Sequence, residues 1–177
     1  RLPHWSLKTK IKLNGQPLSG LKKGTYLTIE RQWKKGDRIE IQLDMSLHVW
    51  RGEQECDGLA SIYRGPLLLA YDHRYNTEHA PKGTGIRDVK NWDPVRCMLQ
   101  MPALDGKSLK AKKVEWGDWL PPLLLLEFKA ANGKKIRLCD FGSAGEAGTP
   151  YCSWLPLKNC PTATPFSRQN PLRSRRP

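Results

Sequence analysis

Two clusters of acidic residues hold the side chains that are best suited to acid–base chemistry. Glu53, Glu55 and Asp57 fall within one short segment, and Glu115 and Asp118 lie beside a pair of tryptophans. Hydrolysis of a glycosidic bond generally uses two carboxyl groups about 5–10 Å apart, one of which stays protonated. A catalytic pair also needs a pocket and perturbed pKa values, and clustered acids are more often a solvated loop. We therefore assign no catalytic residue in this chain.

Cysteine and histidine give little indication of metal chemistry. The five cysteines form an odd set without any C-x-x-C pair, which fits neither a zinc ribbon nor a complete disulfide framework. The four histidines are scattered, and their spacing matches no familiar metal motif. We expect mostly free, packed thiols and no metal or other cofactor in this chain. The residues are Cys56, Cys97, Cys139, Cys152, Cys160, His4, His48, His73 and His79.

Seven tryptophans are many for 177 residues. Their flat rings can stack on sugar rings, but they also fill β-sheet cores and domain seams. We expect core packing for Trp5, Trp33 and Trp154. The candidates for exposure, and so for contact with a carbohydrate, are Trp92, Trp116 and Trp119.

The elements that must position these residues are short β-strands, because no segment keeps an apolar stripe of helical period. Lys10–Leu13 alternates polar and apolar residues and runs into Asn14-Gly15, which predicts a tight hairpin with a return strand from Gln16. Residues 26–30 and 38–43 alternate again. The second of these strands should turn three side chains toward a core, namely Ile39, Ile41 and Leu43.

Further strands are predicted in the second half of the chain. Two apolar pieces flank Arg64-Gly-Pro66, where the proline favours a bend or bulge. Residues 110–116, 123–129 and 134–141 read as three more strands, and Asn132-Gly133 joins the last two as a hairpin.

These strands predict an all-β fold made of two antiparallel β-sandwich-like units, a long connecting excursion and a disordered C-terminal tail. The first unit covers residues 1–71 and the second covers residues 92–157. The polar segment 72–91 is the surface excursion, where binding residues tend to lie. Residues 158–177 form a basic tail that is rich in Pro, Ser, Arg and Asn.

The chain is basic, with 30 Lys and Arg residues against 17 acidic ones and a net charge of +13. This charge alone is the basis for a nucleic-acid-binding alternative, which we disfavour because no recognition motif accompanies it. No signal peptide and no apolar run of about 20 residues is visible, so we expect a soluble segment without a membrane partner and assign no compartment.

A series of short motifs resembles the C-terminal region of the non-reducing-end β-L-arabinofuranosidase-like glycoside hydrolase family. The likeness spans roughly residues 1–157, and the order and spacing of the motifs make the combination specific. The motifs are Arg1–Trp5, Leu13–Gly15, Gly24–Leu27, Trp33–Asp37, Leu43–Met45, Arg64–Pro66, Asp140–Gly145 and Thr149–Pro156.

The resemblance implies a parent enzyme in which an (α/α) barrel carries the catalytic residues and zinc, followed by β-sandwich domains. That barrel is absent here, and its cysteine and glutamate motif has no counterpart in this sequence. The resemblance thus implies a non-catalytic accessory part that supports the barrel. It also implies plant-type glycans as substrates of the parent and a homodimer as one arrangement. A stand-alone carbohydrate-binding module that uses exposed tryptophans is the alternative.

Overall fold

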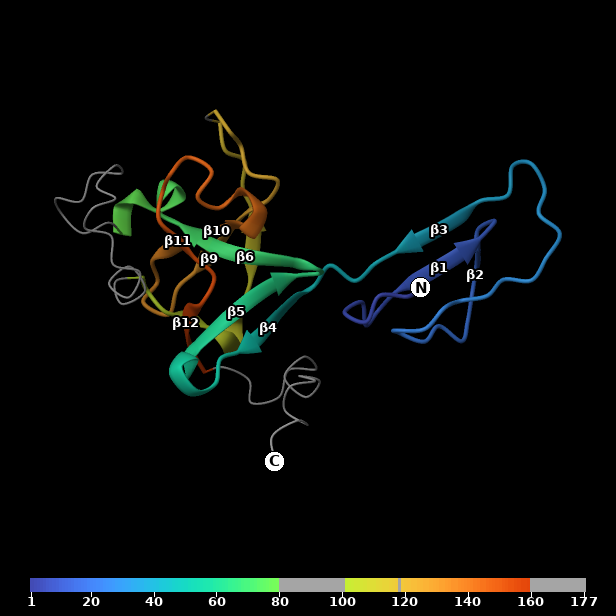
Figure 1. Cartoon of the computed structure of the whole chain (residues 1–177), viewed down its shortest axis with the longest axis horizontal. Helices are drawn as coiled ribbons and strands as arrows, with labels where there is room; N and C mark the ends of the chain where they lie inside the picture. Colours follow the sequence, from blue (N-terminus) through green and yellow to red (C-terminus); the bar gives the residue numbers. More distant parts are fainter. Residues whose placement is uncertain (80–100, 118, 160–177) are drawn as a thin grey trace. The chain divides into compact units, whose positions relative to one another are not determined.

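The computed structural model describes residues 1–79, 101–117 and 119–159, and most of their regular structure is β-strand (Figure 1). The chain divides into two compact units, unit 1 from Arg1 to Ser46 and unit 2 from Leu47 onward. Unit 1 holds a three-stranded sheet and unit 2 a nine-stranded sheet. The predicted all-β class with two sheet units is confirmed.

The sheet of unit 1 is built on the predicted hairpin. Strands β1 (Lys10–Leu13) and β2 (Gln16–Pro17) are antiparallel, and β3 (Ile39–Gln42) pairs with the other edge of β1. Asn14 and Gly15 have φ angles of 50° and 80°, which are those of the two-residue turn that best fits the twist of a hairpin. The sequence prediction for this hairpin is therefore confirmed.

A polar clasp closes the turn region of unit 1. The Asn14 side chain donates to Asp37 at 2.7 Å and accepts from the Arg38 backbone N–H at 2.8 Å. Asp37 also accepts from the Lys34 N–H at 2.8 Å and pairs with Arg31 at 3.1 Å. The Lys34 N–H, the Asn14 amide and the Arg31 charge together lower the pKa of Asp37.

One face of the unit 1 sheet is aliphatic, and its β3 side is exposed. Ile11 lies opposite Ile41 and Leu13 opposite Ile39, so these side chains share a face, while Lys and Glu occupy the other. Ile39 and Ile41 are 43% and 59% exposed, and Leu43 is 37% exposed, so the expectation that these three side chains face a core is wrong for this chain. The physical reason is that unit 1 covers this face at β1, where Ile11 is buried, but not at β3.

In the described residues of unit 2 the strands form a single mixed sheet in the order β7-β12-β5-β6-β10-β9-β8, with β4 added beside β5 and β11 beside β6. Its strands are β4 (Leu47–Arg51), β5 (Leu59–Arg64), β6 (Leu67–Asp72), β7 (Leu104–Asp105), β8 (Ala111–Lys113), β9 (Leu125–Lys129), β10 (Lys135–Asp140), β11 (Tyr151–Cys152) and β12 (Leu155–Lys158). The described residues between them also form 3-10 turns, namely η1 (Gln54–Cys56), η2 (His73–Tyr75), η3 (Thr77–His79), η5 (Gly106–Ser108) and η6 (Phe141–Ser143).

The sheet of unit 2 curls back on itself. Leu104 in β7 forms an antiparallel bridge with Ala130, just beyond β9, and the Ala131 N–H donates to the Ala103 carbonyl at 2.8 Å. Strand β7, at one end of the strand order, thus contacts the segment that follows β9, near the other end. The curved sheet encloses the core. The core residues are Val49, Ala60, Ile62, Leu69, Tyr71, Met101, Leu104, Leu124, Leu126, Phe128, Ala130, Ile136, Leu138, Leu155 and Leu157.

Several sequence expectations need correction. The boundary between the units falls between Ser46 and Leu47 rather than after Tyr71, because β4, β5 and β6 hydrogen-bond within the second sheet. Residues 26–30 form no strand, since no neighbouring strand pairs with them. The pieces around Gly65 form a complete hairpin, β5–β6, with Gly65 at φ 56°, instead of a bend within one strand.

The excursion and the tail are only partly described. Residues 72–79 of the predicted excursion complete β6 and form η2 and η3, so they belong to the body of unit 2. Residues 80–100 and 160–177 lie outside the described residues, and with them Trp92 and most of the predicted tail.

Candidate functional site

One cluster of polar and aromatic side chains in unit 2 is centred on Arg74, in η2. The guanidinium donates from Nη1 to the Leu120 carbonyl at 2.9 Å and from Nη2 to the Trp119 carbonyl. It also lies over two aromatic rings, at 5.4 Å from the Tyr75 centroid and 5.7 Å from the Trp119 centroid. Arg74 therefore holds both the backbone and the ring of Trp119, which is 68% exposed.

Tyr75 and Trp116 continue this arrangement toward the interior. Their rings meet edge to face, 5.0 Å apart at 89°, and Trp116 is half-buried. Tyr75 is 1% exposed, and burial raises its pKa to about 12, so its phenol is neutral. Within the described structure, the Tyr75 hydroxyl and the Trp116 indole N–H are buried without a hydrogen-bond partner.

The buried carboxylate of Asp72 connects the segments that hold Arg74, Gly145 and Thr149. Its carboxylate is 1% exposed and accepts from the Arg74 N–H at 2.8 Å, from the Gly145 N–H at 2.8 Å and from the Thr149 hydroxyl at 2.6 Å. Three separate segments are thereby tied to one buried group. Buried carboxylates need such partners, because an unpaired one is costly to desolvate.

Asp140 does the same for a second group of loops. This residue is 5% exposed and accepts from the Leu124 N–H at 2.9 Å and from the Ser143 N–H at 3.0 Å. The Ser143 hydroxyl donates to Asp140 and accepts from the Leu123 N–H at 3.2 Å. Arg74 at one end and Asp140 with Ser143 at the other therefore hold residues 119–124.

Four exposed apolar side chains lie on segments that these groups hold: two in residues 119–124, one in η6 and one in β11. We call these four side chains the loop surface. Phe141 and Tyr151 contact each other edge to face at 5.8 Å, and the Leu123 N–H donates to the hydroxyl of Ser143, in the same turn as Phe141. The members and their exposed fractions are Trp119 68%, Leu123 75%, Phe141 44% and Tyr151 41%.

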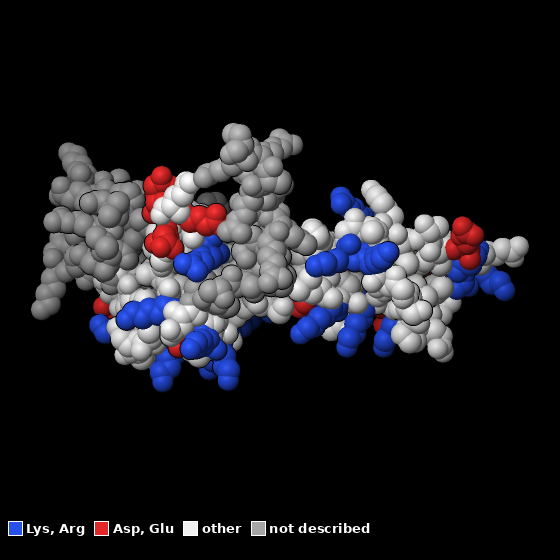
Figure 2. All heavy atoms as spheres, turned by 90° about the horizontal axis from the view of Figure 1, so that it is seen from below, with Lys and Arg blue, Asp and Glu red and all other residues white. Residues whose placement is uncertain are grey.

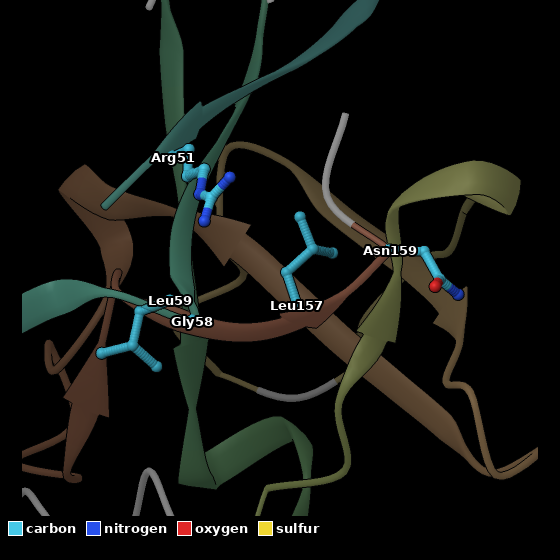
Figure 3. A pocket seen from close by; sticks show the side chains of 5 residues that line it. All are labelled: Arg51, Gly58, Leu59, Leu157 and Asn159. Carbon is cyan, nitrogen blue, oxygen red and sulfur yellow. The ribbon is translucent and has the colours of Figure 1, made fainter. Parts of the chain in front are cut away.

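A small pocket of about 220 Å³ lies elsewhere in unit 2 (Figure 3). It is lined by Arg51 at the end of β4, by Gly58 and Leu59, and by Leu157 and Asn159 around β12. Its polar groups are engaged within the chain: Arg51 pairs with Asp57 at 3.1 Å, and the Asn159 amide donates to Asp105 at 3.1 Å. The pocket thus offers no unsatisfied charge to a ligand.

The structure does not assemble the predicted acids into a catalytic pair among the residues it describes. Glu53, Glu55 and Asp57 are exposed, around η1. Glu115 is exposed and pairs with Lys113 at 3.3 Å. Asp118 lies outside the described residues. Exposed carboxylates of this kind lack the enclosed setting that a general acid needs.

No group of three or more His, Cys, Asp and Glu residues in residues 1–79, 101–117 and 119–159 could hold a metal ion. Cys56 and Cys139 are free thiols. Burial and the nearby carboxylates of Asp72 and Asp140 raise the pKa of Cys139 far above its usual range, which keeps it a neutral thiol and a poor metal ligand. The expectation that this chain holds no cofactor stays a prediction.

Basic side chains do not gather into one patch on the face shown in Figure 2, where Lys and Arg are spread over both units and acidic residues lie among them. The described part of the chain also has no helix that is long and apolar enough to cross a membrane.

Trp33, expected in a core, is 52% exposed and lies beside Arg31, with the guanidinium 5.3 Å from its ring centroid.

Sequence reasoning found Trp116 and Trp119 but missed Arg74, Asp72 and Asp140. For Asp140 a signal was present, because an Asp followed three residues later by Ser is typical of a capped turn. Asp72 likewise caps η2 through the Arg74 N–H. The contact of Arg74 with Trp119 joins residues 45 positions apart and left no local signal.

Comparison with known proteins finds a similar fold in solved structures of glycoside hydrolases. Residues 1–45 match the family model described as "Beta-L-arabinofuranosidase, GH127 middle domain". A solved structure titled "Glycoside hydrolase" matches 89% of this chain with 23% identity and a TM-score of 0.66. A GH127 β-L-arabinofuranosidase from Geobacillus stearothermophilus T6 matches 89% with 16% identity and a TM-score of 0.61.

A GH127 β-arabinofuranosidase also matches, over 85% of this chain, with 17% identity and a TM-score of 0.54. The chain spans about a quarter of the length of these three structures, 27%, 26% and 23%. No curated protein matches the sequence significantly. The resemblance to the β-L-arabinofuranosidase-like family that the motifs predict is thus confirmed, and the three solved structures share the fold of this chain.

Proposed function

We propose that this chain is a non-catalytic, structural β part of a larger glycoside hydrolase that resembles the β-L-arabinofuranosidases. Its role is to pack against and support a separate catalytic part, for which the resemblance implies an (α/α) barrel. The match of residues 1–45 to a domain described as the middle of such an enzyme carries the proposal, because a middle domain belongs to a longer protein.

The make-up of unit 1 supports a packing role. In 46 residues it buries two hydrophobic side chains, Leu2 and Ile11, whereas units of this size usually need a metal, disulfides or a partner surface to be stable. On its aliphatic sheet face, Ile39 and Ile41 also stay about half exposed. Covering these two side chains with another sheet or helix layer would contribute about 1 kcal/mol each, roughly half the value for a fully exposed side chain.

The arrangement of the acids supports the absence of catalysis in this chain. The described carboxylates are exposed, as Glu55 is, partly buried and paired with basic side chains, as Glu127 is, or buried and saturated by donors, as Asp72 and Asp140 are. A retaining or inverting pair needs one acid that is accessible to substrate and also protonated. These settings do not favour such an acid.

The test is hydrolysis of an aryl β-L-arabinofuranoside by the purified 177-residue chain, with added zinc and, separately, with a chelator. We expect no release of the aryl group under either condition, with the Geobacillus enzyme as the positive control. Turnover that purifies with the chain would overturn the proposal. Substitution of Glu53, Glu55, Asp57 and Glu115 by the corresponding amides would then identify the acids responsible.

A further inference from the structure

We propose that the outer edge of β3 in unit 1 pairs with the same edge of a second copy of this chain, antiparallel and related by two-fold symmetry. β3 is the last strand in the order β2-β1-β3, and no described strand pairs with its outer edge (Figure 1). Such an edge offers a row of backbone donors and acceptors to another strand. The proposal concerns this edge and does not depend on the function proposed above.

The hydrogen bonds on the inner side of β3 show which backbone groups the outer edge offers. The Arg38 carbonyl accepts from the Asn14 N–H at 2.9 Å. The Asp44 N–H donates to the Ser6 hydroxyl at 2.7 Å. The even-numbered residues of this segment therefore turn their backbone groups inward, and the direction alternates along an antiparallel strand. The outer edge presents the N–H and C=O groups of Ile39, Ile41 and Leu43.

Other edge strands of the described sheets carry features that block such pairing, and β3 does not. β2 is two residues long and ends in Pro17, which has no N–H to donate. β8 is three residues long, and two of these residues are lysines. Short length, proline and lysine are the usual means of protecting an edge. The segment from Ile39 to Leu43 has neither proline nor lysine, and all four residues of β3 are exposed.

The aliphatic side chains of β3 match each other when Ile41 lies opposite Ile41 of the second copy. Ile39 then lies opposite Leu43 of the other copy, and this pair occurs twice by symmetry. These side chains fall on one face of the strand, where they are 43%, 59% and 37% exposed for Ile39, Ile41 and Leu43. Aliphatic cross-strand pairs stabilise a sheet, and here they also remove exposed apolar surface from water.

The polar face is complementary in the same register. Arg38 lies opposite Asp44 of the other copy, twice, and Glu40 lies opposite Gln42. Hydrogen bonds from Ser46 lower the pKa of Asp44, so its carboxylate is charged at neutral pH. A register shifted by two residues would place Glu40 opposite either Glu40 or Asp44 of the other copy, and like charges directly opposite destabilise a sheet. The charges thus favour one register.

This self-complementarity favours a second copy over a strand of another protein. Two-fold pairing repeats every contact, so a self-complementary edge gains each favourable pair twice. Pairing joins the two three-stranded sheets edge to edge and leaves their aliphatic faces continuous, so another layer can still cover them. The contact is short and falls below the area of standard interfaces, so we expect reversible association rather than a permanent dimer.

The experiment is sedimentation velocity of the 177-residue chain from micromolar to millimolar concentration, where we expect a monomer–dimer equilibrium. Arg38→Asp should weaken association about tenfold, because two attractive cross-strand pairs become repulsive. Lys129→Asp is the matched control. Lys129 is an exposed strand residue of unit 2, and its substitution makes the same change in net charge. It should leave the equilibrium unchanged.

A mixture of two variants tests the register itself. Asp44→Arg should weaken association about as much as Arg38→Asp does, because each variant alone places like charges opposite each other in its own dimer. In a mixed dimer every one of these pairs is attractive again. An equimolar mixture of the two variants should therefore associate as strongly as the unmodified chain. Misfolding of either variant could not produce this recovery.

Hydrogen exchange separates pairing at the edge from stacking of the aliphatic faces. The amide protons of Ile39, Ile41 and Leu43 should exchange several-fold more slowly in concentrated than in dilute protein, as measured by NMR. Their N–H groups are bonded in the paired dimer. Stacking of the faces would bury the side chains and leave these amides unprotected.

Four results would overturn the proposal: a monomer throughout the concentration range, equal association of the Arg38→Asp and Lys129→Asp variants, no recovery in the mixture, or association without protection of the β3 amides. Protection of these amides only in a protein that joins this chain to a catalytic part would also overturn it, and would assign the edge to a strand of that part. None of these results alters the outcome of the hydrolysis test above, so the two proposals fail separately.

Discussion

The two units of this chain use their apolar residues in opposite ways. Unit 2 encloses a core of fifteen hydrophobic residues in a sheet that curls back on itself, and it displays a few aromatic side chains on loops that buried carboxylates hold. Unit 1 buries Leu2 and Ile11 and leaves the aliphatic side chains of β3 exposed. Exposed apolar side chains therefore occur in two settings: on the regular strand β3 in unit 1 and around segments anchored by buried carboxylates in unit 2.

The polar anchors of the two units differ in burial and in reach. The Asp37 side chain in unit 1 is 10% exposed and accepts from Lys34, Asn14 and Arg31 around one turn. Asp72 in unit 2 is 1% exposed and accepts hydrogen bonds from three separate segments. Loss of the Asp72 carboxylate therefore leaves more deeply buried groups without a partner than loss of the Asp37 carboxylate does.

The largest effect is expected for Asp72→Ala. The N–H groups of Arg74 and Gly145 and the hydroxyl of Thr149 lose their acceptor, and each buried unsatisfied group costs about 1–3 kcal/mol. We expect unit 2 to lose about 3 kcal/mol or more of its free energy of unfolding, measured by urea denaturation and followed by tryptophan fluorescence.

The matched control for this prediction is Asp37→Ala, which removes the carboxylate anchor of unit 1. It should leave the unfolding transition of unit 2 where it is in the unmodified chain. If Asp72→Ala shifted that transition no more than Asp37→Ala does, Asp72 would not hold the loops of unit 2, and the contrast between the anchors of the two units would fail.

An intermediate effect is expected for Gly145→Ala. Gly145 has a φ of 75°, and a Cβ there would lie 2.5 Å from Cε1 of Tyr151. We expect a loss of about 2 kcal/mol, in the range reported for strained backbone positions, together with displacement of the Tyr151 ring. Denaturation and the near-ultraviolet circular dichroism of the aromatic rings measure the two consequences separately.

Gly148→Ala separates backbone strain from the clash with Tyr151. Gly148 has nearly the same φ, 73°, but nothing lies within 4 Å of its added Cβ. It should lose about 1 kcal/mol and keep the aromatic dichroism. Equal losses for the two variants would mean that the close approach of Gly145 to Tyr151 adds nothing to the stability of the loop surface.

Sequence reasoning succeeded where the signal was local. Asn14-Gly15 and Asn132-Gly133 mark hairpins that the structure forms. At the first, both residues take the positive φ that a two-residue turn needs, and at the second, Gly133 alone does, in a longer turn that the Ala130 N–H closes on the Lys134 carbonyl. Alternation also placed Ile39 and Ile41 on one face of a strand. It could not show that this face lacks a cover, since what lies opposite a strand is not encoded in the strand.

Sequence reasoning failed where the outcome depends on distant partners. Residues 26–30 alternate like a strand and form none, while Leu47–Arg51 was missed and forms β4 because β5 lies beside it. In the candidate site, Trp119 could be predicted as exposed because it lies close to Pro121 and Pro122. Its contact with Arg74 could not be predicted, because the pairing of β6, β10 and β9 is what brings the two residues together.

The smallest effect is expected for Ile41→Lys. Its size tests whether the aliphatic side chains of β3 are exposed in this chain and covered in a longer one. Ile41 is 59% exposed, so in the 177-residue chain the substitution should change the free energy of unfolding by no more than about 0.5 kcal/mol. It should also reduce the fluorescence of a bound apolar dye. Glu40→Lys, the control on the opposite face, should leave the dye signal unchanged.

In a protein that joins this chain to the catalytic part proposed above, Ile41→Lys should instead cost several kcal/mol and Glu40→Lys little, because the proposal has only the Ile41 face covered. A negligible effect of Ile41→Lys in the longer protein would show that the face stays exposed there too. The side chains of β3 would then be surface residues in the longer protein as well, and the packing role proposed for unit 1 would fail.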